Sequence, residues 1–298
     1  MDTQTLKYIG KDLYKTHILK EWKRYIVFMT RCHLHKGQIN DLLDFFKATP
    51  QRQAMLEHTT SFVEQTTRAF FYKDSTWDER IAIVKNHIEY MENIFNDEAI
   101  AKLYVNGERI RLWEDVYEEQ PVVMELWFHG GQRKEGCLSL VLSLGADELY
   151  QIMFWLAPSP EDNELSLWIG ALQGTPNGSE IIKGLTKAFF GYRTKNLIFY
   201  GIRNVAAGLG CKHLYAVSNA GYYAMNHVRR DRKLKTSLDD FWQECEGQVC
   251  KDQRFFEMPI EESMEELKPS KRAQHRRRFA KMDEITESVT EVLNNYKK

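Results

Sequence analysis

The spacing of apolar residues along the chain changes at about residue 101. Before that point apolar side chains recur every three or four positions, as in Ile18, Trp22, Tyr25, Ile26 and Met29. This is the period of an α-helix that buries one face. Residues 1–100 are therefore predicted to form a helical N-terminal region.

After residue 101 the period shortens toward two. Apolar runs at residues 122–128, 138–144, 149–156 and 165–169 are separated by short segments rich in Gly, Asn, Asp and Pro, a pattern typical of antiparallel strands joined by tight turns. Helical segments at 179–190 and 195–209 and a further apolar strand at 213–217 follow, and predict a right-handed β–α–β crossover. Residues 101–260 are thus predicted to form a domain built on a mixed sheet.

The remaining residues, 261–298, are strongly charged. Lys271, Arg272 and the run of Arg276, Arg277 and Arg278 precede apolar residues at helical spacing. A basic C-terminal helical tail is predicted here. The fold class expected for the whole chain is α+β, or mixed α/β.

Composition narrows the class of protein. The 298 residues are 43% hydrophobic and carry 41 basic against 42 acidic side chains, which indicates a globular chain and disfavours nucleic acid as a partner. Five dispersed cysteines without a CxxC pair fit a reducing compartment. Cys32, His33 and His35 are metal-ligand types, but no second ligand pair follows at finger spacing, so no metal is expected.

No apolar run approaches the ~20 residues that a membrane-spanning helix needs. The expected location is the cytoplasm, with a peripheral position at the inner membrane as a second option. The sequence does not indicate an oligomeric state.

A polar turn between the strand at 165–169 and the next helix has the composition of an anion site. It contains Gln173, Gly174, Asn177, Gly178 and Ser179. Small residues let the backbone approach a ligand, and amides at a helix N-terminus favour phosphate or pyrophosphate. The alternative is an ordinary loop with a capped helix.

Candidates for proton transfer near this turn are Glu125, His129, Tyr215 and Tyr223. An acyl transfer requires a base for the acceptor and an acid for the leaving thiolate, and these side chains have suitable chemistry. Each of them is also a common packing or surface residue. The Arg276–Arg278 run is a candidate clamp for phosphate oxygens, or else a solvated helix face.

The central region resembles the acetyltransferase superfamily that uses acyl-CoA (GNAT). Gln173 and Gly178 match the first and last positions of its Gln/Arg-x-x-Gly-x-Gly/Ala motif, while Pro176 stands at the middle glycine. Asn219 and the downstream Tyr223 resemble the superfamily's strand-end asparagine and tyrosine. The resemblance implies a GNAT-like central sheet with acyl-CoA as the candidate cofactor, held at 173–179 and Asn219.

A second resemblance covers most of the chain. Several separate motifs occur in the order found in the bacterial VirK/YbjX family: Ile169-Gly-Ala-Leu-Gln-Gly174, Tyr192-Arg-Thr-Lys-Asn-Leu197, Val217-Ser-Asn-Ala220, Asp240-Phe-Trp-Gln-Glu244 and Ser270-Lys-Arg-Ala-Gln-His-Arg-Arg-Arg-Phe279. The resemblance implies a Gram-negative bacterial protein associated with virulence and with tolerance of cationic antimicrobial peptides. It implies no particular reaction.

Three functions follow as hypotheses. The first is an acyltransferase that takes acyl-CoA or a similar phosphorylated donor and modifies an envelope component. The second is a non-enzymatic envelope or virulence factor whose basic tail binds anionic lipid or a protein partner. The third, a regulator acting on nucleic acid, is the least supported because charge is balanced.

Overall fold

All the named elements of the N-terminal region up to residue 104 are helices. The computed structural model describes residues 3–128, 132–175, 179–226, 237–261 and 272–298. The helices of this region are α1 (Thr3–Leu13), α2 (Leu19–Leu34), α3 (Lys36–Lys47), α4 (Pro50–His58), α5 (Ser61–Thr67), α6 (Trp77–Ile94) and α7 (Asp97–Tyr104). The start of α6 is fixed by a capping box, in which Thr76 accepts from the Glu79 amide and Glu79 accepts from the Thr76 amide.

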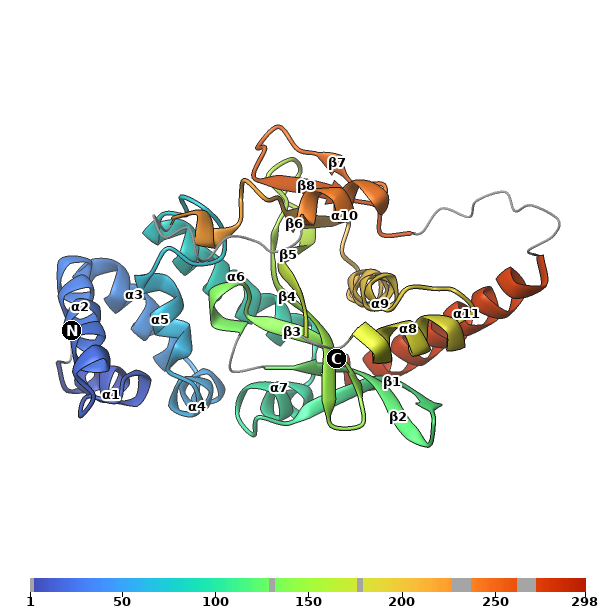
Figure 1. The fold of residues 1–298 in the computed structure, drawn as a ribbon. Coiled ribbons are helices and arrows are strands. Elements are labelled where there is room, and N and C mark those ends of the chain that lie inside the picture. The colour runs from blue at the N-terminus through green and yellow to red at the C-terminus, as the bar shows by residue number, and fades with distance from the viewer. Residues whose placement is uncertain (1–2, 129–131, 176–178, 227–236, 262–271) are drawn as a thin grey trace.

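The centre of the molecule is a mixed sheet of eight strands (Figure 1). Its order is β1 (Arg109–Tyr117), β2 (Gln120–Trp127), β3 (Leu138–Leu144), β4 (Asp147–Pro158), β5 (Leu165–Gly174), β6 (His213–Val217), β8 (Phe255–Met258) and β7 (Gln248–Val249). Strands β1 to β5 pair as an antiparallel meander, and β6 is parallel to β5. The predicted mixed α and β fold class is confirmed.

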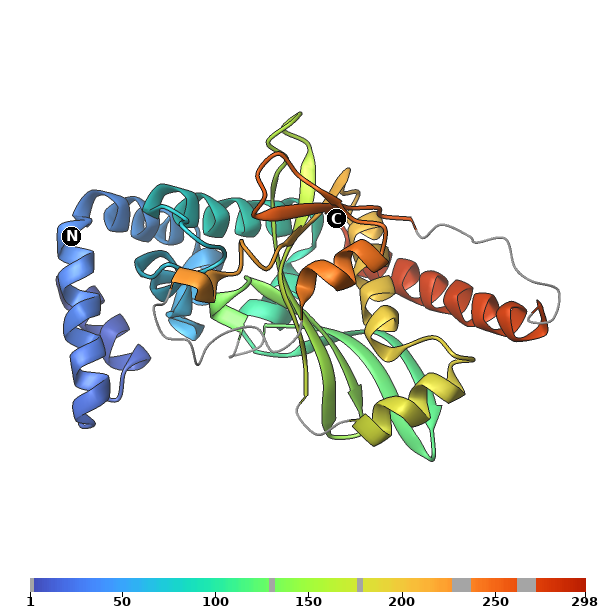
Figure 2. The ribbon, with the colours of Figure 1, turned by 45° about the horizontal axis from the view of Figure 1, so that its top comes forward.

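Two helices connect β5 to its parallel neighbour, α8 (Ser179–Ala188) and α9 (Thr194–Gly208). A Cβ on Gly201 of α9 would lie 2.2 Å from the Met124 sulfur of β2 and 3.2 Å from Leu140 of β3. Glycine therefore lets α9 lie directly on this face of the sheet. The long helix α11 (Arg272–Tyr296) packs beside α9 and against β1 (Figure 2), which confirms the predicted C-terminal helix.

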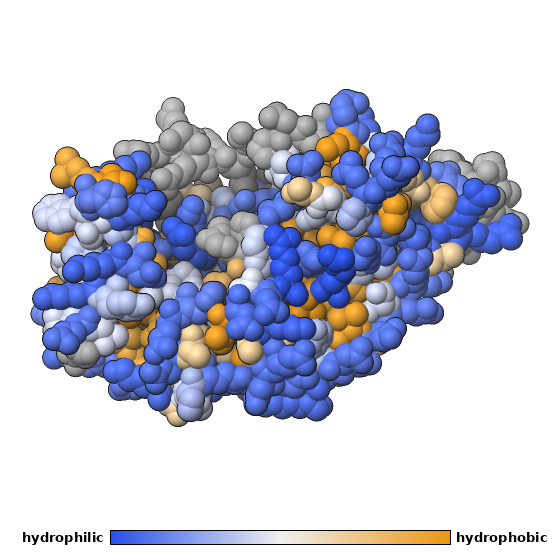
Figure 3. All heavy atoms as spheres, turned by 90° about the horizontal axis from the view of Figure 1, so that it is seen from below, coloured by the Kyte–Doolittle hydropathy of each residue, from blue (hydrophilic) through white to orange (hydrophobic). Residues whose placement is uncertain are grey.

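The N-terminal helices lie to one side of the sheet, and α8, α9 and α11 lie to the other side in the view of Figure 1. The helix α6 packs along β4 beyond the end of β3, where the buried His87 accepts a hydrogen bond from the Leu156 amide. The face seen in Figure 3 is largely hydrophilic, with apolar residues showing in small areas between polar ones. Among the helices that the structure describes, none has the length and the apolar run needed to cross a bilayer.

Candidate active site where β5 and β6 separate

Strands β5 and β6 pair over only part of their length. The ladder joins Ser166 to His213 and ends at Ile169 and Ala216, whereas β5 continues beside β4 as far as Gly174. The sheet therefore opens beyond Ile169, and no strand among the described residues pairs with β5 on that side.

Gly170 marks the point of opening. The β4–β5 register shifts here, since Met153 is opposite Ala171 and Phe154 is opposite Ile169, which leaves Gly170 as an extra residue. A Cβ on Gly170 would lie 1.8 Å from the Glu135 carbonyl oxygen. Only glycine allows the loop that carries Glu135 to cross the strand so closely.

Glu135 is a buried carboxylate at this opening. It lies in the β2–β3 connection just after a short 3-10 turn, Gln132–Lys134, and its exposed fraction is 3%. The Tyr222 hydroxyl and the Gln173 Nε2 donate hydrogen bonds to its Oε1, at 2.9 and 3.0 Å. Burial raises the pKa of Glu135 to about 7, against the smaller lowering effects of Tyr222, Lys134 and Gln173. A carboxyl with this pKa can take up and release a proton near neutral pH.

The N-terminal helices hold the Glu135 loop in place. Gln65 of α5, which is fully buried, donates from Nε2 to the Gly136 carbonyl at 2.7 Å. The Phe71 amide donates to the Lys134 carbonyl at 2.8 Å. An ion pair of 2.7 Å joins Arg133 to Glu64 of the same helix α5. The helical region thus positions the carboxylate against the sheet.

Tyr222 reaches Glu135 from the segment that follows β6. This segment is bound to the loop after α5, because Tyr72 and Tyr222 form an isolated β-bridge and the Lys73 amide donates to Gly221. Burial raises the pKa of Tyr222 further above its usual value. Tyr223, a predicted site residue, packs its ring 5.0 Å from that of Tyr222. Glu135, Gln173, Tyr222 and Tyr223 together form the Glu135 cluster.

The predicted anion turn is described only in part. Gln173 and Gly174 are the last residues of β5, Asn177 and Gly178 lie outside the described residues, and Ser179 begins α8. The Thr175 amide donates to Leu149 at 3.0 Å. Because hydrogen-bonded and non-hydrogen-bonded pairs alternate in an antiparallel ladder, the Gly174 amide faces away from β4, toward the opening.

Asn219 is at the end of β6, close to the cluster in sequence, but its amide group serves the fold. Its Oδ1 accepts from the Leu238 amide at 2.7 Å, and its Nδ2 donates to Ser237 at 3.0 Å. These bonds fix the start of α10 (Leu238–Glu244) beside the strand end. A role for Asn219 in holding a cofactor would require these contacts to be replaced.

Glu125 and Tyr215 lie away from the opening. Glu125 on β2 is buried and forms ion pairs with Arg109 and Arg111 of β1, at 3.0 and 3.2 Å. Tyr215 on β6 pairs with Trp168, roughly 15 Å along β5 from Gln173 at ~3.3 Å per residue. Its hydroxyl is 3.1 Å from the Ser159 hydroxyl. His129 lies outside the described residues.

The three arginines of the tail lie on α11, away from the Glu135 cluster. Arg276 and Arg277 are exposed, and Arg278 is half-buried with its guanidinium 5.2 Å from the Tyr192 ring centroid. The structure therefore joins Gln173 to Glu135, packs Tyr223 against Tyr222, and places Arg276–Arg278 elsewhere. Within the described ranges, no group of three or more His, Cys, Asp or Glu side chains is arranged to hold a metal ion.

Glu135 and Tyr222 were not among the predicted site residues. Glu135 follows a polar loop and has no motif around it, so nothing in its neighbours predicts burial. Gly170 was the available signal, because a glycine inside an apolar strand often indicates a bulge or a close approach by another backbone. That signal marks the strand but does not tell which loop approaches it.

Comparison with known proteins places the chain in a family. The family described as "Protein of unknown function (DUF535)" matches residues 17–291. An uncharacterized protein of Haemophilus influenzae is 21% identical over 269 residues, 87% of each chain. The uncharacterized protein YbjX of Escherichia coli is 30% identical over 129 residues, 40% of this chain and 38% of YbjX. No solved structure matches.

The family match spans most of the chain, including all eight strands and the Glu135 loop. The relatives come from Gram-negative bacteria, and YbjX is among them. The predicted resemblance to the VirK/YbjX group is confirmed, and the chain belongs to the DUF535 family.

Proposed function

We propose that this protein is an acyltransferase that uses Glu135 as its general base at the opening between β5 and β6. The observation that carries the proposal is the buried Glu135 carboxyl, whose pKa is raised to about 7 beside Gln173 at that opening. Glu125 is a poorer candidate for the base, because two arginines already pair with it.

The proposed reaction transfers an acyl group from a thioester to an amine or hydroxyl of an envelope component or its precursor. The acceptor attacks the thioester carbonyl and loses a proton to Glu135, while the carbon–sulfur bond breaks. Tyr223 is the candidate acid that returns a proton to the thiolate. The products are the acylated acceptor and the free thiol.

The arrangement of strands supports an acyl-CoA donor. An antiparallel meander ends in β5, which runs parallel to β6 and then separates from it, as the GNAT resemblance implies. The Gly174 amide faces this opening, and α8 begins at Ser179 immediately after the turn. A phosphorylated donor would place its anionic end at the turn and its acyl end toward Glu135.

The test is binding and turnover of CoA thioesters by the full chain. We expect acetyl-CoA or a longer acyl-CoA to raise the melting temperature, and Gln173→Ala to reduce that shift. With water as the acceptor of the acyl group, Glu135→Gln should retain binding but lose ~10²-fold or more of thiol release, since it removes the base. Glu89→Gln, at an exposed carboxyl on α6, is the matched control.

Two results would contradict the proposal. One is the absence of any saturable binding by CoA or its thioesters in calorimetry. The other is thiol release that is equal in wild type, Glu135→Gln and Glu89→Gln, because the buried carboxyl would then take no part in the reaction.

A second candidate function, binding to an anionic lipid surface, is favoured by an observation on α2. The apolar side chains of Leu19, Trp22, Ile26 and Val27 are 41–69% exposed along this helix. Lys20 and Lys23 are exposed beside them. A helix with exposed aromatic and aliphatic residues next to lysines is suited to the boundary between lipid headgroups and acyl chains.

Sedimentation with liposomes tests this candidate and separates α2 from the basic tail. Binding through α2 should require phosphatidylglycerol and should fall in the double variant Leu19→Ser, Trp22→Ser. Binding through the tail should fall instead in Arg276→Ala, Arg277→Ala. Equal sedimentation with and without liposomes would exclude the lipid-binding function.

A further inference from the structure

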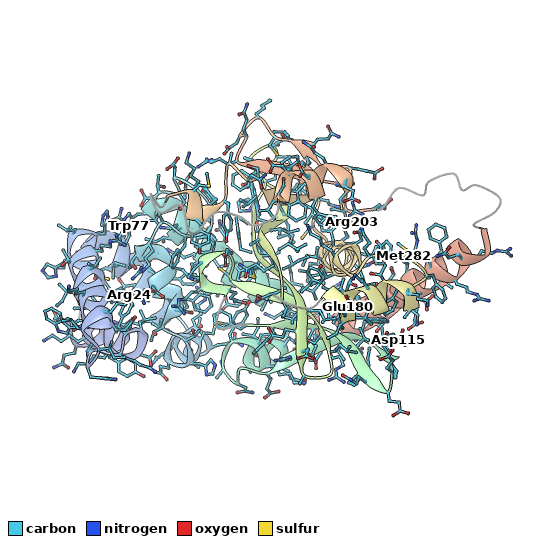
Figure 4. All side chains as sticks on the ribbon, in the orientation of Figure 1. Arg24, Trp77, Asp115, Glu180, Arg203 and Met282 are labelled. Atoms are coloured by element: carbon cyan, nitrogen blue, oxygen red, sulfur yellow. The ribbon has the colours of Figure 1, made fainter. Side chains whose placement is uncertain are left out.

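A cavity of about 660 Å³ lies between α9, α11 and the C-terminal end of α10. Figure 4 shows Arg203 on α9 and Met282 on α11, both of which line it. The cavity shares no lining residue with the Glu135 cluster. Its volume is in the range of pockets that hold small organic ligands.

Arg203 is the most unusual residue in this cavity. Its exposed fraction is 4%, so a positive charge is buried in the wall. Its Nη2 donates to the Cys245 carbonyl at 2.9 Å and its guanidinium lies 4.5 Å from the Phe199 ring centroid. Its Nε is buried without a hydrogen-bond partner, and among the described residues no carboxylate forms an ion pair with it.

Two further polar atoms of the cavity are buried without partners. They are Nε of Arg278, whose side chain lies over the Tyr192 ring, and Oδ1 of Asn196. Buried polar atoms are nearly always paired in folded proteins. The three atoms belong to residues that line one cavity, and two of them are donors on guanidinium groups, which favours an occupant with oxygen acceptors.

The remainder of the wall is fixed by hydrogen bonds between α9 and α11. Tyr200, Asn204 and Thr286 hydrogen-bond to one another and join α9 to α11, with the Tyr200 and Thr286 hydroxyls 2.7 Å apart. These groups are satisfied, so they form a fixed floor. Phe199 and Met282 add apolar surface.

Carboxylates also line the cavity and bear on its charge. Glu244 forms an ion pair with Arg193, whereas Glu246, Glu261 and Asp283 are exposed side chains at the rim. Exposed charges are screened by water and salt, and a buried guanidinium is screened much less. The inner wall therefore favours an anion although the rim carries acids.

We propose that this cavity binds a small organic phosphate ester, with the phosphate between Arg203 and Arg278 and the organic part against the apolar wall. Guanidinium groups pair with phosphate oxygens through two parallel hydrogen bonds. Asn196 would accept a hydrogen bond from a hydroxyl or amine of the ligand. The proposal is independent of the acyl-transfer reaction.

Phenyl phosphate is a suitable probe, with inorganic phosphate and phenol as its separate halves. Calorimetry on the full chain should show saturable binding of phenyl phosphate, weaker binding of phosphate and none of phenol. Arg203→Met and Arg278→Met should each weaken binding of phenyl phosphate at least tenfold. Arg277→Met is the matched control, because Arg277 belongs to the same arginine run but does not line the cavity.

A second measurement separates a binding role of Arg203 from a structural one. A guanidinium that is held for a ligand costs stability in the empty protein, so Arg203→Met should leave the melting temperature unchanged or raise it. The proposal would be overturned if Arg203→Met lowered the melting temperature and Arg278→Met left the binding of phenyl phosphate unchanged. The absence of saturable binding by both phenyl phosphate and phosphate would also overturn it.

Discussion

Two buried glutamates on the central sheet differ in what surrounds them. Glu125 on β2 is 6% exposed and forms ion pairs with Arg109 and Arg111. Glu135 is 3% exposed, and within the described part of the chain its side chain receives hydrogen bonds only from the neutral groups of Tyr222 and Gln173. The two carboxylates are similarly buried, so they differ chiefly in their hydrogen-bond and ion-pair partners.

The two sites differ in whether a cation compensates the buried carboxylate. Beside β1 the cations compensate the charge of Glu125, as expected for a carboxylate that supports structure. At the opening of the sheet, burial raises the pKa of Glu135 to about 7 and no arginine or lysine pairs with it among the described ion pairs. A protein retains such a group at a cost in stability, which is typical of functional sites.

The largest effect on stability is expected from filling the space at Gly170, where the Glu135 loop crosses β5. Gly170→Val would force a side chain into the carbonyl oxygen of Glu135, with a Cβ position 1.8 Å from it. Because backbone rather than a movable side chain blocks the space, we expect a loss of about 4 kcal/mol or more in the free energy of unfolding. Urea unfolding measures it.

Gly37→Ala is the control for this substitution, since a Cβ at that position of α3 has no neighbour within 4 Å. It should raise stability by roughly 0.5–1 kcal/mol, the difference in helix propensity. A Gly170→Val variant as stable as wild type would show that the loop does not cross β5 as described.

Neutralising the two glutamates should change the stability of the protein in opposite directions at pH 8. The pKa of Glu135 rises from 4.5 to about 7 on folding, so its contribution to stability is greatest below pH 4.5 and is lost as the pH rises to 7. At ~1.4 kcal/mol per pH unit, this loss is about 3 kcal/mol. Glu135→Gln should therefore stabilise the protein by about 2–3 kcal/mol at pH 8.

The gain should nearly vanish at pH 4.5, where the carboxyl of Glu135 is protonated in the folded state and already half protonated in the unfolded state. Urea unfolding of wild type and variant at the two pH values measures the difference. Tyr222 and Gln173 both donate to Oε1 of Glu135, and the glutamine retains an amide oxygen that can take this place, so both hydrogen bonds survive. Equal stability differences at both pH values would show that Glu135 does not titrate in this window.

Glu125→Gln should destabilise the protein, in contrast to Glu135→Gln. Removing the charge leaves Arg109 and Arg111 without their shared partner, although both side chains are partly exposed at 38% and 52%. Water can solvate them, so we expect a loss of only about 1–2 kcal/mol at pH 8. If this variant were also stabilised, the contrast between the two carboxylates would disappear.

Much of the fold follows from local patterns in the sequence. The helical spacing before residue 101 and the alternation after it predicted helices followed by a mixed sheet, because each element buries one face. The capping residues Thr76 and Glu79 lie at the N-cap and in the first turn of the helix they start. Signals of this kind can be recognised from a few neighbouring residues, without knowledge of the tertiary fold.

The candidate site depends on contacts between distant segments. Glu135 meets Gln173 and Tyr222 across separations of 38 and 87 residues, and Gln65 of α5 holds the same loop. Gln173 was predicted because its turn has a recognisable composition. Glu135 was not predicted, because residue type alone does not distinguish it from Glu125. Only the fold shows which of the two carboxylates has cations beside it.

The smallest effects should come from the two neutral donors to Glu135. Tyr222 lowers the pKa of Glu135 more than Gln173 does, and each stabilises the ionised form by a hydrogen bond. Tyr222→Phe should therefore raise that pKa further, and Gln173→Ala should raise it less, each by up to about one pH unit since a bond to a charged group contributes ~1.5 kcal/mol. The pH midpoint of the ¹³C-carboxyl signal of Glu135 reports these shifts, and an unchanged midpoint in Tyr222→Phe would mean that the hydroxyl does not bind the carboxylate in solution.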